Sequence, residues 1–268
     1  MKTQVEQILV GEIEMRYFSF GHGKETMVIL PGLSVQSVML FADAVIDAYA
    51  PLTDDFTIYV FDRREAPPQS YSVFDMACDT AKVMMAIGLK DVCLFGASQG
   101  GMIAMVLAAE YPALVKKLAL GSTASRITDA QMQRLDQWVK AAQEKDGVKL
   151  YLSFGELVYP KAVFKAARET LVSAGKSVTD GEFARFALLA SAMNGFDFTA
   201  RLPEIQCPVL VLGATDDAVL GADASREIAQ TFAGRENVEL HIYDEGFGHA
   251  AYDTAPDYKE RLQRFFLK

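Results

Sequence analysis

The 268-residue chain is predicted to have an α/β fold, a mostly parallel sheet flanked by helices and interrupted by an all-helical insertion. Short apolar runs alternate with stretches of helical periodicity, a pattern typical of parallel strands joined by helical crossovers. Most runs are apolar at every position, as expected for strands buried on both faces. After Ser122 the alternation stops and only helical periods follow until about residue 200, which predicts the insertion.

The first segment differs from the later runs. Residues 12–17 alternate charged and apolar side chains, as in an antiparallel strand with one face in water. An antiparallel hairpin is therefore expected at the edge of the sheet. The parallel strands are predicted from continuous apolar runs at residues 26–32, 56–62, 91–96 and 115–122.

Helical periodicity predicts crossover helices over 73–89 and 102–111. In the insertion, apolar residues recur on one helical face, for example Leu135 and Val139, so each helix has a stripe to bury. The strand pattern resumes at 208–213. A helix at 223–232, a strand at 238–243 and a terminal helix from Thr254 complete the chain.

Charge and composition exclude several classes of partner. The net charge of −9 opposes binding to nucleic acid, whose phosphates attract basic proteins. Cys78, Cys93 and Cys207 form no CxxC pair, which argues against a disulfide framework or a zinc site. The N-terminal segment lacks a signal-peptide pattern, and no apolar run is long enough to span a membrane. We expect a soluble, cytoplasmic protein; the oligomeric state stays open.

The strongest chemical motif is Gly96-Ala97-Ser98-Gln99-Gly100, between an apolar run and a helical stretch. A serine at such a strand-turn-helix junction projects its hydroxyl from a strained backbone, with glycines where side chains would collide. The first free N–H groups of the helix, beginning at Gln99, would face the developing negative charge. Ser98 is therefore the candidate nucleophile, and it needs a histidine base oriented by an acid.

Of the three histidines, His22 lies in a turn before a strand and His241 lies inside a strand-like run. His249 follows the last strand in a glycine-rich loop, at the edge where open α/β sheets collect catalytic groups. His249 is the candidate base. Asp216 and Asp217 follow the strand at 208–213, at its carboxyl end; only one of them is expected to serve as the acid, and spacing does not choose between them.

Together these residues resemble the α/β-hydrolase family, in its serine-nucleophile branch with a helical cap. The resemblance covers nearly the whole chain, keeps the order Ser, Asp, His, and includes the elbow at 96–100. The family's acid follows a strand as GxxD, which corresponds here to 213–216. The resemblance therefore implies a catalytic triad of Ser98, Asp216 and His249.

The resemblance also implies the domain boundaries. Residues 197–205 are similar to the family's return from cap to core, so a cap is expected at 124–200, inserted in a core of 1–123 and 201–268. The family's His-Gly after its first parallel strand is replaced by Pro31-Gly32-Leu33. The resemblance still implies an oxyanion hole made by the backbone N–H groups of Leu33 and Gln99.

The function expected from the resemblance is hydrolysis of a small carboxylic ester or thioester through an acyl-enzyme, without metal or cofactor. An apolar acyl or aryl group would suit the substrate. Lactone hydrolysis or cleavage of a carbon–carbon bond by the same triad remains an alternative. A second alternative is a non-enzymatic ligand-binding protein on this fold, since function must be argued from the site.

In the loop at 62–68, Arg63 and Arg64 are expected to form surface ion pairs.

Overall fold

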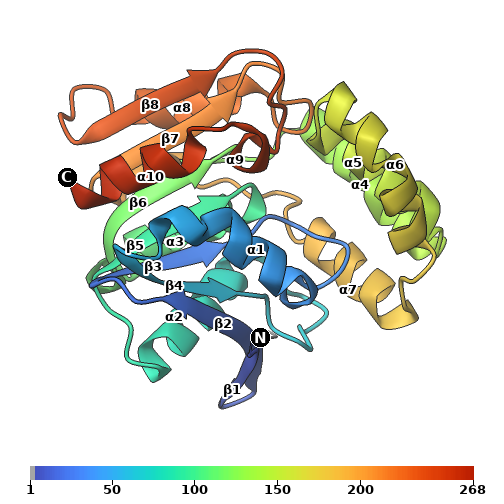
Figure 1. The fold of residues 1–268 in the computed structure, drawn as a ribbon, viewed down its shortest axis with the longest axis horizontal. Helices are drawn as coiled ribbons and strands as arrows, with labels where there is room; N and C mark the ends of the chain where they lie inside the picture. The colour runs from blue at the N-terminus through green and yellow to red at the C-terminus, as the bar shows by residue number, and fades with distance from the viewer. Residues whose placement is uncertain (1–3) are drawn as a thin grey trace.

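The computed structural model describes residues 4–268, which form an eight-stranded sheet with the order β1-β2-β4-β3-β5-β6-β7-β8 (Figure 1). Residues 1–3 of the predicted core lie outside the described residues. The strands are β1 (Glu6–Val10), β2 (Ile13–Gly21), β3 (Glu25–Leu30), β4 (Phe56–Phe61), β5 (Val92–Ala97), β6 (Val115–Gly121), β7 (Val209–Ala214) and β8 (Val238–Tyr243). Strand β2 pairs antiparallel with both β1 and β4, and β3 to β8 run parallel. The prediction of a mostly parallel sheet with an antiparallel edge is confirmed.

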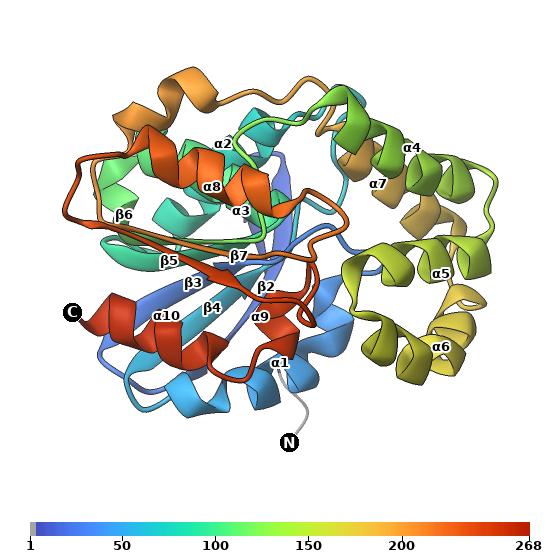
Figure 2. The same cartoon turned by 90° about the horizontal axis from the view of Figure 1, so that it is seen from above.

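Helices cover both faces of the sheet (Figure 2). One face carries α2 (Val73–Ala86), α3 (Gln99–Glu110) and α8 (Ala222–Thr231), and the other carries α1 (Ala42–Tyr49) and α10 (Tyr258–Leu267). The short helices are η1 (Val38–Phe41), η2 (Ala50–Leu52), η3 (Pro112–Leu114), η4 (Thr199–Glu204) and α9 (Ala251–Thr254).

This two-sided burial explains the continuous apolar runs. In β7, Val209 and Val211 belong to the apolar cluster under α3, whereas Leu210 and Leu212 belong to the cluster under α10. Successive side chains of a strand point to opposite faces. Both faces of β7 therefore need apolar residues.

Between β6 and η4 the chain forms four helices, which stand to one side of the sheet in both ribbon views (Figures 1 and 2). They are α4 (Asp129–Gln143), α5 (Gly147–Val158), α6 (Lys161–Gly175) and α7 (Asp180–Ser191). Helix α4 packs on α7, and α5 packs on α6. Capping boxes begin two of them, with Thr128 capping α4 and Thr179 capping α7, which satisfies N–H groups that have no partner inside the helix. We call α4 to α7, together with the loop between α7 and η4, the helical insertion.

Parallel strands bring their carboxyl ends to one edge of the sheet. The loops that follow β3, β5, β7 and β8 at this edge contain the predicted site residues. Within residues 4–268, no helix is both long and apolar enough to cross a bilayer.

Candidate active site

Ser98 occupies a sharp turn between β5 and α3. Its backbone has φ 52° and ψ −121°, a left-handed conformation that is unfavourable for a residue with a side chain. Strand β5 ends at Ala97 and α3 begins at Gln99, so Ser98 alone makes the reversal. The predicted strand-turn-helix context of the motif is therefore present.

Close packing explains the glycines on either side of the turn. A Cβ atom on Gly96 would lie 2.4 Å from the carbonyl oxygen of Gly100, and one on Gly100 would lie 2.0 Å from the carbonyl oxygen of Leu30. Both distances are shorter than any real contact of a Cβ atom. The turn can form only because both positions lack a side chain.

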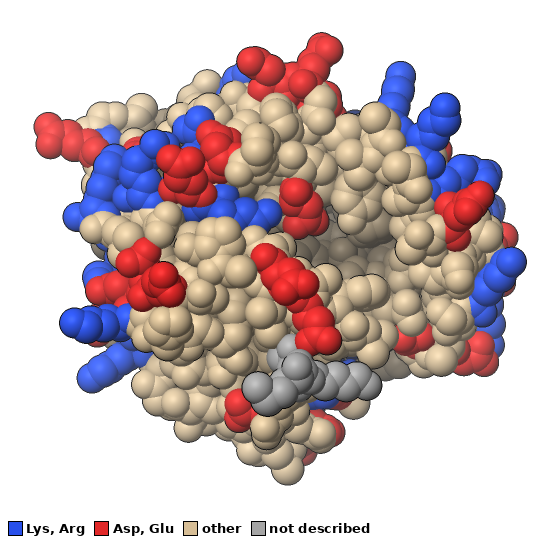
Figure 3. All heavy atoms as spheres, in the orientation of Figure 1, with Lys and Arg blue, Asp and Glu red and all other residues tan. Residues whose placement is uncertain are grey.

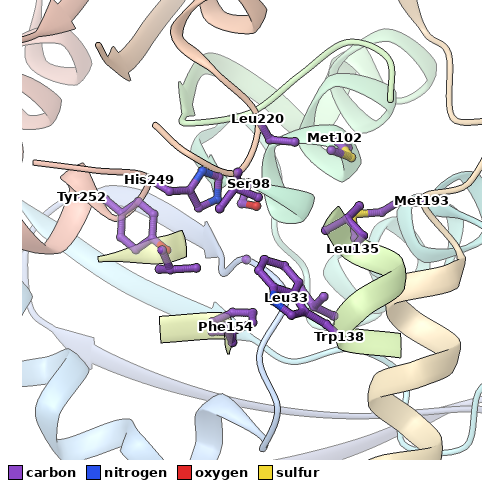
Figure 4. Close-up of a pocket in the computed structure, with 13 residues that line it drawn as sticks. Leu33, Ser98, Met102, Leu135, Trp138, Phe154, Met193, Leu220, His249 and Tyr252 are labelled. Carbon is purple, nitrogen blue, oxygen red and sulfur yellow. The ribbon is translucent and has the colours of Figure 1, made fainter. Parts of the chain in front are cut away.

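His249 lies in the loop after β8 and is buried, with 3% of its surface exposed. The loop needs two residues with positive φ, and glycine occupies both, with φ 110° at Gly246 and 63° at Gly248. The imidazole lies beside Ser98 (Figure 4). The other histidines lie elsewhere: His22 approaches Asp54 at 3.3 Å, and the His241 ring packs on Tyr243.

The carboxylate partner of His249 is Asp217. The Nδ1 atom of His249 lies 2.9 Å from Oδ2 of Asp217, while Oδ1 of Asp217 accepts the N–H groups of Val219 and Leu220, each at 2.9 Å. Burial alone would raise the pKa of Asp217, but His249 and these two N–H groups hold it below its ordinary value. An ionised carboxylate only accepts, so Nδ1 of His249 is the donor in this hydrogen bond, which leaves Nε2 as the acceptor of a neutral imidazole.

The prediction of Asp216 as the acid is therefore wrong. Asp216 instead accepts the N–H of Gly246 at 2.8 Å with one oxygen and the N–H of Gly248 at 2.9 Å with the other. These glycines belong to the loop that carries His249. The two neighbouring side chains point in different directions, so that Asp217 contacts the imidazole and Asp216 holds the loop.

The two residues predicted to form an oxyanion hole come from different segments, Gln99 from the start of α3 and Leu33 from the loop after β3. Gln99 is the first residue of α3, so no carbonyl of that helix can accept its N–H. Leu33 lines the same cavity as Ser98, and a Cβ atom on Gly32 would lie 3.2 Å from Cβ of Ser98. The loop after β3 thus approaches Ser98 closely. The side chain of Gln99 points away and donates to the carbonyl of Leu189 in α7, at 2.7 Å.

Ser98 and His249 line a cavity of about 380 Å³, counted with its opening to solvent. The core adds Gly32, Leu33, Met102, Val219, Leu220 and Tyr252, and the helical insertion adds Leu135, Trp138, Phe154, Val158 and Met193 (Figure 4). Most of this lining is apolar. Among the described residues, no group of three or more His, Cys, Asp or Glu side chains is arranged to hold a metal ion.

Sequence reasoning missed an ion pair between the helical insertion and the core. Arg185 of α7 donates to Oδ1 of Asp62 at 3.0 Å and to the carbonyl of Arg63 at 3.1 Å. Ser37 also donates to Asp62. Burial alone would raise the pKa of Asp62, but Arg185, Ser37 and the N–H of Arg63 together lower it. The position of Asp62 directly after a strand was a signal that the sequence offered. No local pattern marked Arg185 as its partner.

The expected surface ion pairs of Arg63 and Arg64 need correction. Arg63 is buried, with 4% of its surface exposed, and donates to the carbonyl of Pro31. Burial lowers the pKa of Arg63 to about 10. Arg64 lies 3.6 Å from Asp79, and both side chains are mostly buried. These arginines fix the loop after β4 against the core.

The chain matches the family model described as alpha/beta hydrolase fold over residues 25–256. A protein from Agrobacterium fabrum that carries the name carbamate hydrolase RutD is 29% identical over 228 residues, which cover 81% of this chain and 85% of that protein. A protein of the same name from Caulobacter segnis is 30% identical over 225 residues, covering 80% and 82%.

Solved structures share the fold at lower identity. An alpha/beta hydrolase named MGS-M2, from a deep-sea metagenome library of the Medee basin, has a TM-score of 0.85 and 19% identity, and the match covers 98% of both chains. The enol-lactonase of Burkholderia xenovorans has a TM-score of 0.81 and 20% identity, with 98% of this chain and 100% of that chain covered. The chain therefore belongs to the α/β-hydrolase fold family of enzymes.

Proposed function

We propose that this hydrolase cleaves a small carboxylic ester or thioester through an acyl-enzyme formed on Ser98. One observation supports the proposal most directly. A buried imidazole, hydrogen-bonded to the ionised Asp217, lies beside a serine on a strained turn, and both residues line one apolar cavity. This is the arrangement that an activated serine nucleophile requires.

In the proposed first half-reaction, Nε2 of His249 takes the proton of the Ser98 hydroxyl while Oγ attacks the acyl carbon. The carbonyl oxygen becomes an oxyanion, which accepts the N–H groups of Leu33 and Gln99. Asp217 stabilises the imidazolium. When the bond to the leaving group breaks, His249 gives its proton to the departing oxygen or sulfur, and the acyl group remains on Ser98.

In the second half-reaction, water replaces the alcohol or thiol. His249 takes a proton from the water as its oxygen attacks the acyl carbon, and the same two N–H groups hold the second oxyanion. The bond to Oγ then breaks, and the proton on His249 returns to Ser98. The product is the free carboxylic acid, and the enzyme regains its starting state.

The cavity supports an apolar acyl or aryl group. Most of the side chains that line it are aliphatic or aromatic, as in sites that bind apolar groups. The space-filling view shows a hollow of mostly uncharged surface between the core and the helical insertion, with acidic side chains along its core side (Figure 3). Acidic groups there disfavour anionic substrates.

We further propose that residues 124–200 act as a cap over a core of 1–123 and 201–268. The contacts at the site support this division. The helical insertion supplies one wall of the cavity, whereas Ser98, Asp217 and His249 all belong to the core. The cytoplasmic location expected from the sequence stays a prediction.

Three other activities would use related machinery. The names of the relatives suggest a carbamate, whose carbonyl carbon is open to the same attack. Lactones and carbon–carbon bonds of diketones are the alternatives already raised by the sequence. The remaining alternative is a protein that binds a ligand without turnover. A panel of matched ester, thioester, lactone, carbamate and diketone substrates, with products identified by mass spectrometry, separates the reactions.

The first test is labelling with a fluorophosphonate, followed by mapping of the adduct by peptide mass spectrometry. We expect the adduct on Ser98, and its loss in Ser98→Ala and His249→Ala. A folded protein that never labels, or one that labels elsewhere, would refute the proposed nucleophile. Tight binding of an ester without turnover would support the ligand-binding alternative.

A further inference from the structure

Trp138 lines the cavity, and its indole N–H is a donor without an acceptor. The residue lies in α4, lines the cavity and is 2% exposed. Its Nε1 atom is buried, and no atom of the described residues accepts its hydrogen. Leaving a buried donor unpaired costs free energy, and such groups in native proteins need an explanation.

The surroundings of the indole supply no substitute. The nearest aromatic partner is Phe154, with ring centroids 4.6 Å apart and planes tilted by 46°, and a ring face is at best a weak acceptor. Of the five cavity residues that the helical insertion supplies, Trp138 is the one with a side-chain N–H. A phenylalanine would cover the same wall without burying a donor.

The position of Trp138 distinguishes it from the expected oxyanion hole. Leu33 and Gln99 belong to the core, whereas Trp138 lies on the wall that α4 forms, across the cavity from His249 (Figure 4). No lysine or arginine lines the cavity, so a carboxylate at this point would lack a counter-charge. A neutral oxygen, such as that of a ketone or an amide, matches a single N–H donor.

We infer that the Trp138 indole N–H donates a hydrogen bond to a neutral oxygen on the acyl group of the substrate, away from the carbonyl that is attacked. The preferred substrates are then oxo-acyl esters or thioesters rather than plain alkanoyl ones. This inference rests on the proposed function, because it places the acyl group in this cavity.

A spectroscopic test uses the fact that Trp138 is the single tryptophan of the chain. Its indole N–H gives one signal in a ¹H–¹⁵N spectrum of ¹⁵N-labelled Ser98→Ala protein. We titrate this protein with methyl hexanoate and with its 4-oxo and 5-oxo derivatives. The indole proton should move downfield with an oxo ester and not with the plain ester. Equal changes with all three ligands would overturn the inference.

A kinetic test measures kcat/KM for p-nitrophenyl hexanoate and its 4-oxo and 5-oxo derivatives. In the unmodified enzyme, one oxo ester should be favoured over the plain ester roughly three- to tenfold more than in Trp138→Phe, as expected for one neutral hydrogen bond. Phe154→Leu is the control, because it reshapes the same wall and keeps the donor. This variant should keep the oxo preference.

The two tests separate this inference from the proposed function. If the plain and oxo esters are hydrolysed with a ratio that Trp138→Phe leaves unchanged, the inference is wrong and the ester hydrolase stands. If no ester is hydrolysed, the proposed function is wrong, and the indole signal still decides whether Trp138 meets an oxygen acceptor.

Discussion

The core and the helical insertion both line the cavity, but they hold their side chains in different ways. In the core, Asp217 and Asp216 each accept two backbone N–H groups, so the loops after β7 and β8 fix one another. The insertion contributes Leu135, Phe154 and other side chains whose positions depend on packing alone. We therefore expect turnover to depend on the core and substrate selectivity to depend on the insertion.

Hydrogen bonds join the insertion to the loops after β7 and β8. In α4, Gln131 donates to the carbonyl of Leu220 at 2.6 Å, and Arg134 donates to the carbonyl of Val219 at 3.0 Å. The N–H of Ala250, in the loop after β8, donates to the carbonyl of Val158 in α5 at 3.0 Å. The insertion therefore contacts both loops without supplying a proposed reacting group.

The largest effect on turnover is expected at Asp217, in the core. Asp217→Asn removes the acceptor that fixes the His249 tautomer, and kcat should fall by about 10⁴-fold, as for other triad acids. Steady-state kinetics on an activated ester measures the loss. A loss below tenfold, with the fold intact by circular dichroism, would contradict the assignment of Asp217 as the acid.

The next effect concerns stability and tests the ion pair between α7 and the core. Arg185→Met leaves Asp62 buried without its main counter-charge, and should cost about 3 kcal/mol of unfolding free energy. Arg185→Lys keeps the charge but loses the geometry of two donors. Its unfolding free energy should lie between those of the unmodified protein and Arg185→Met. Urea unfolding at neutral pH measures both. Equal stability of all three proteins would show that the insertion docks by packing alone.

The same ion pair predicts a pH dependence. The pKa of Asp62 is lower in the folded protein than its ordinary value of 3.8, so the unfolded chain binds the proton more readily. The stabilisation is complete at neutral pH and is lost as the pH falls below about 4 toward the lower folded pKa. Asp62→Asn should reduce this acid loss relative to the unmodified protein, measured by urea unfolding between pH 3 and pH 7.

A smaller effect is expected at Asp216. Asp216→Asn leaves only one accepting oxygen for the N–H groups of Gly246 and Gly248, so the loop that carries His249 should loosen. We expect kcat to fall about tenfold, in keeping with the loss of one charge-assisted hydrogen bond, with KM nearly unchanged. The rate of fluorophosphonate labelling should fall in parallel. A loss as large as that of Asp217→Asn would mean that both carboxylates act on the imidazole.

The smallest effect sharpens the role of the insertion. Leu135→Ala enlarges the cavity and should shift the preference toward longer acyl chains, by about fourfold in kcat/KM for each extra methylene buried. A series of p-nitrophenyl esters from butanoate to octanoate measures the shift. Reduced activity on all chain lengths equally would indicate that Leu135 supports the fold rather than the substrate.

Local patterns predicted most of the fold, and they singled out Ser98 and His249, which line one cavity in the structure. The apolar runs fixed the parallel strands because burial on both faces leaves a continuous signal, as in β7. The elbow at Ser98 was recognisable because the serine and both glycines lie within five consecutive residues, although the contact that excludes a side chain at Gly100 comes from the distant Leu30. His249 followed from its place at the carboxyl end of a strand.

What the sequence could not resolve depends on loop direction and on distant partners. Asp216 and Asp217 are adjacent in the chain. The GxxD motif selected Asp216, whereas the structure pairs His249 with Asp217. The turn at Val219 and Leu220 makes the choice, because the N–H groups of these residues hold the Asp217 carboxylate. No sequence motif marks this turn. The pairing of Asp62 with Arg185 joins residues 123 apart, and nothing local marks it.

The left-handed backbone of Ser98 has a consequence for stability. Glycine adopts φ near 52° without the steric penalty that a Cβ atom brings, and such strain is worth on the order of 1–3 kcal/mol. Ser98→Gly should therefore melt at a higher temperature than the active enzyme while losing turnover. The proposed nucleophile would then be a residue that lowers the stability of its own turn in exchange for the position of its hydroxyl group.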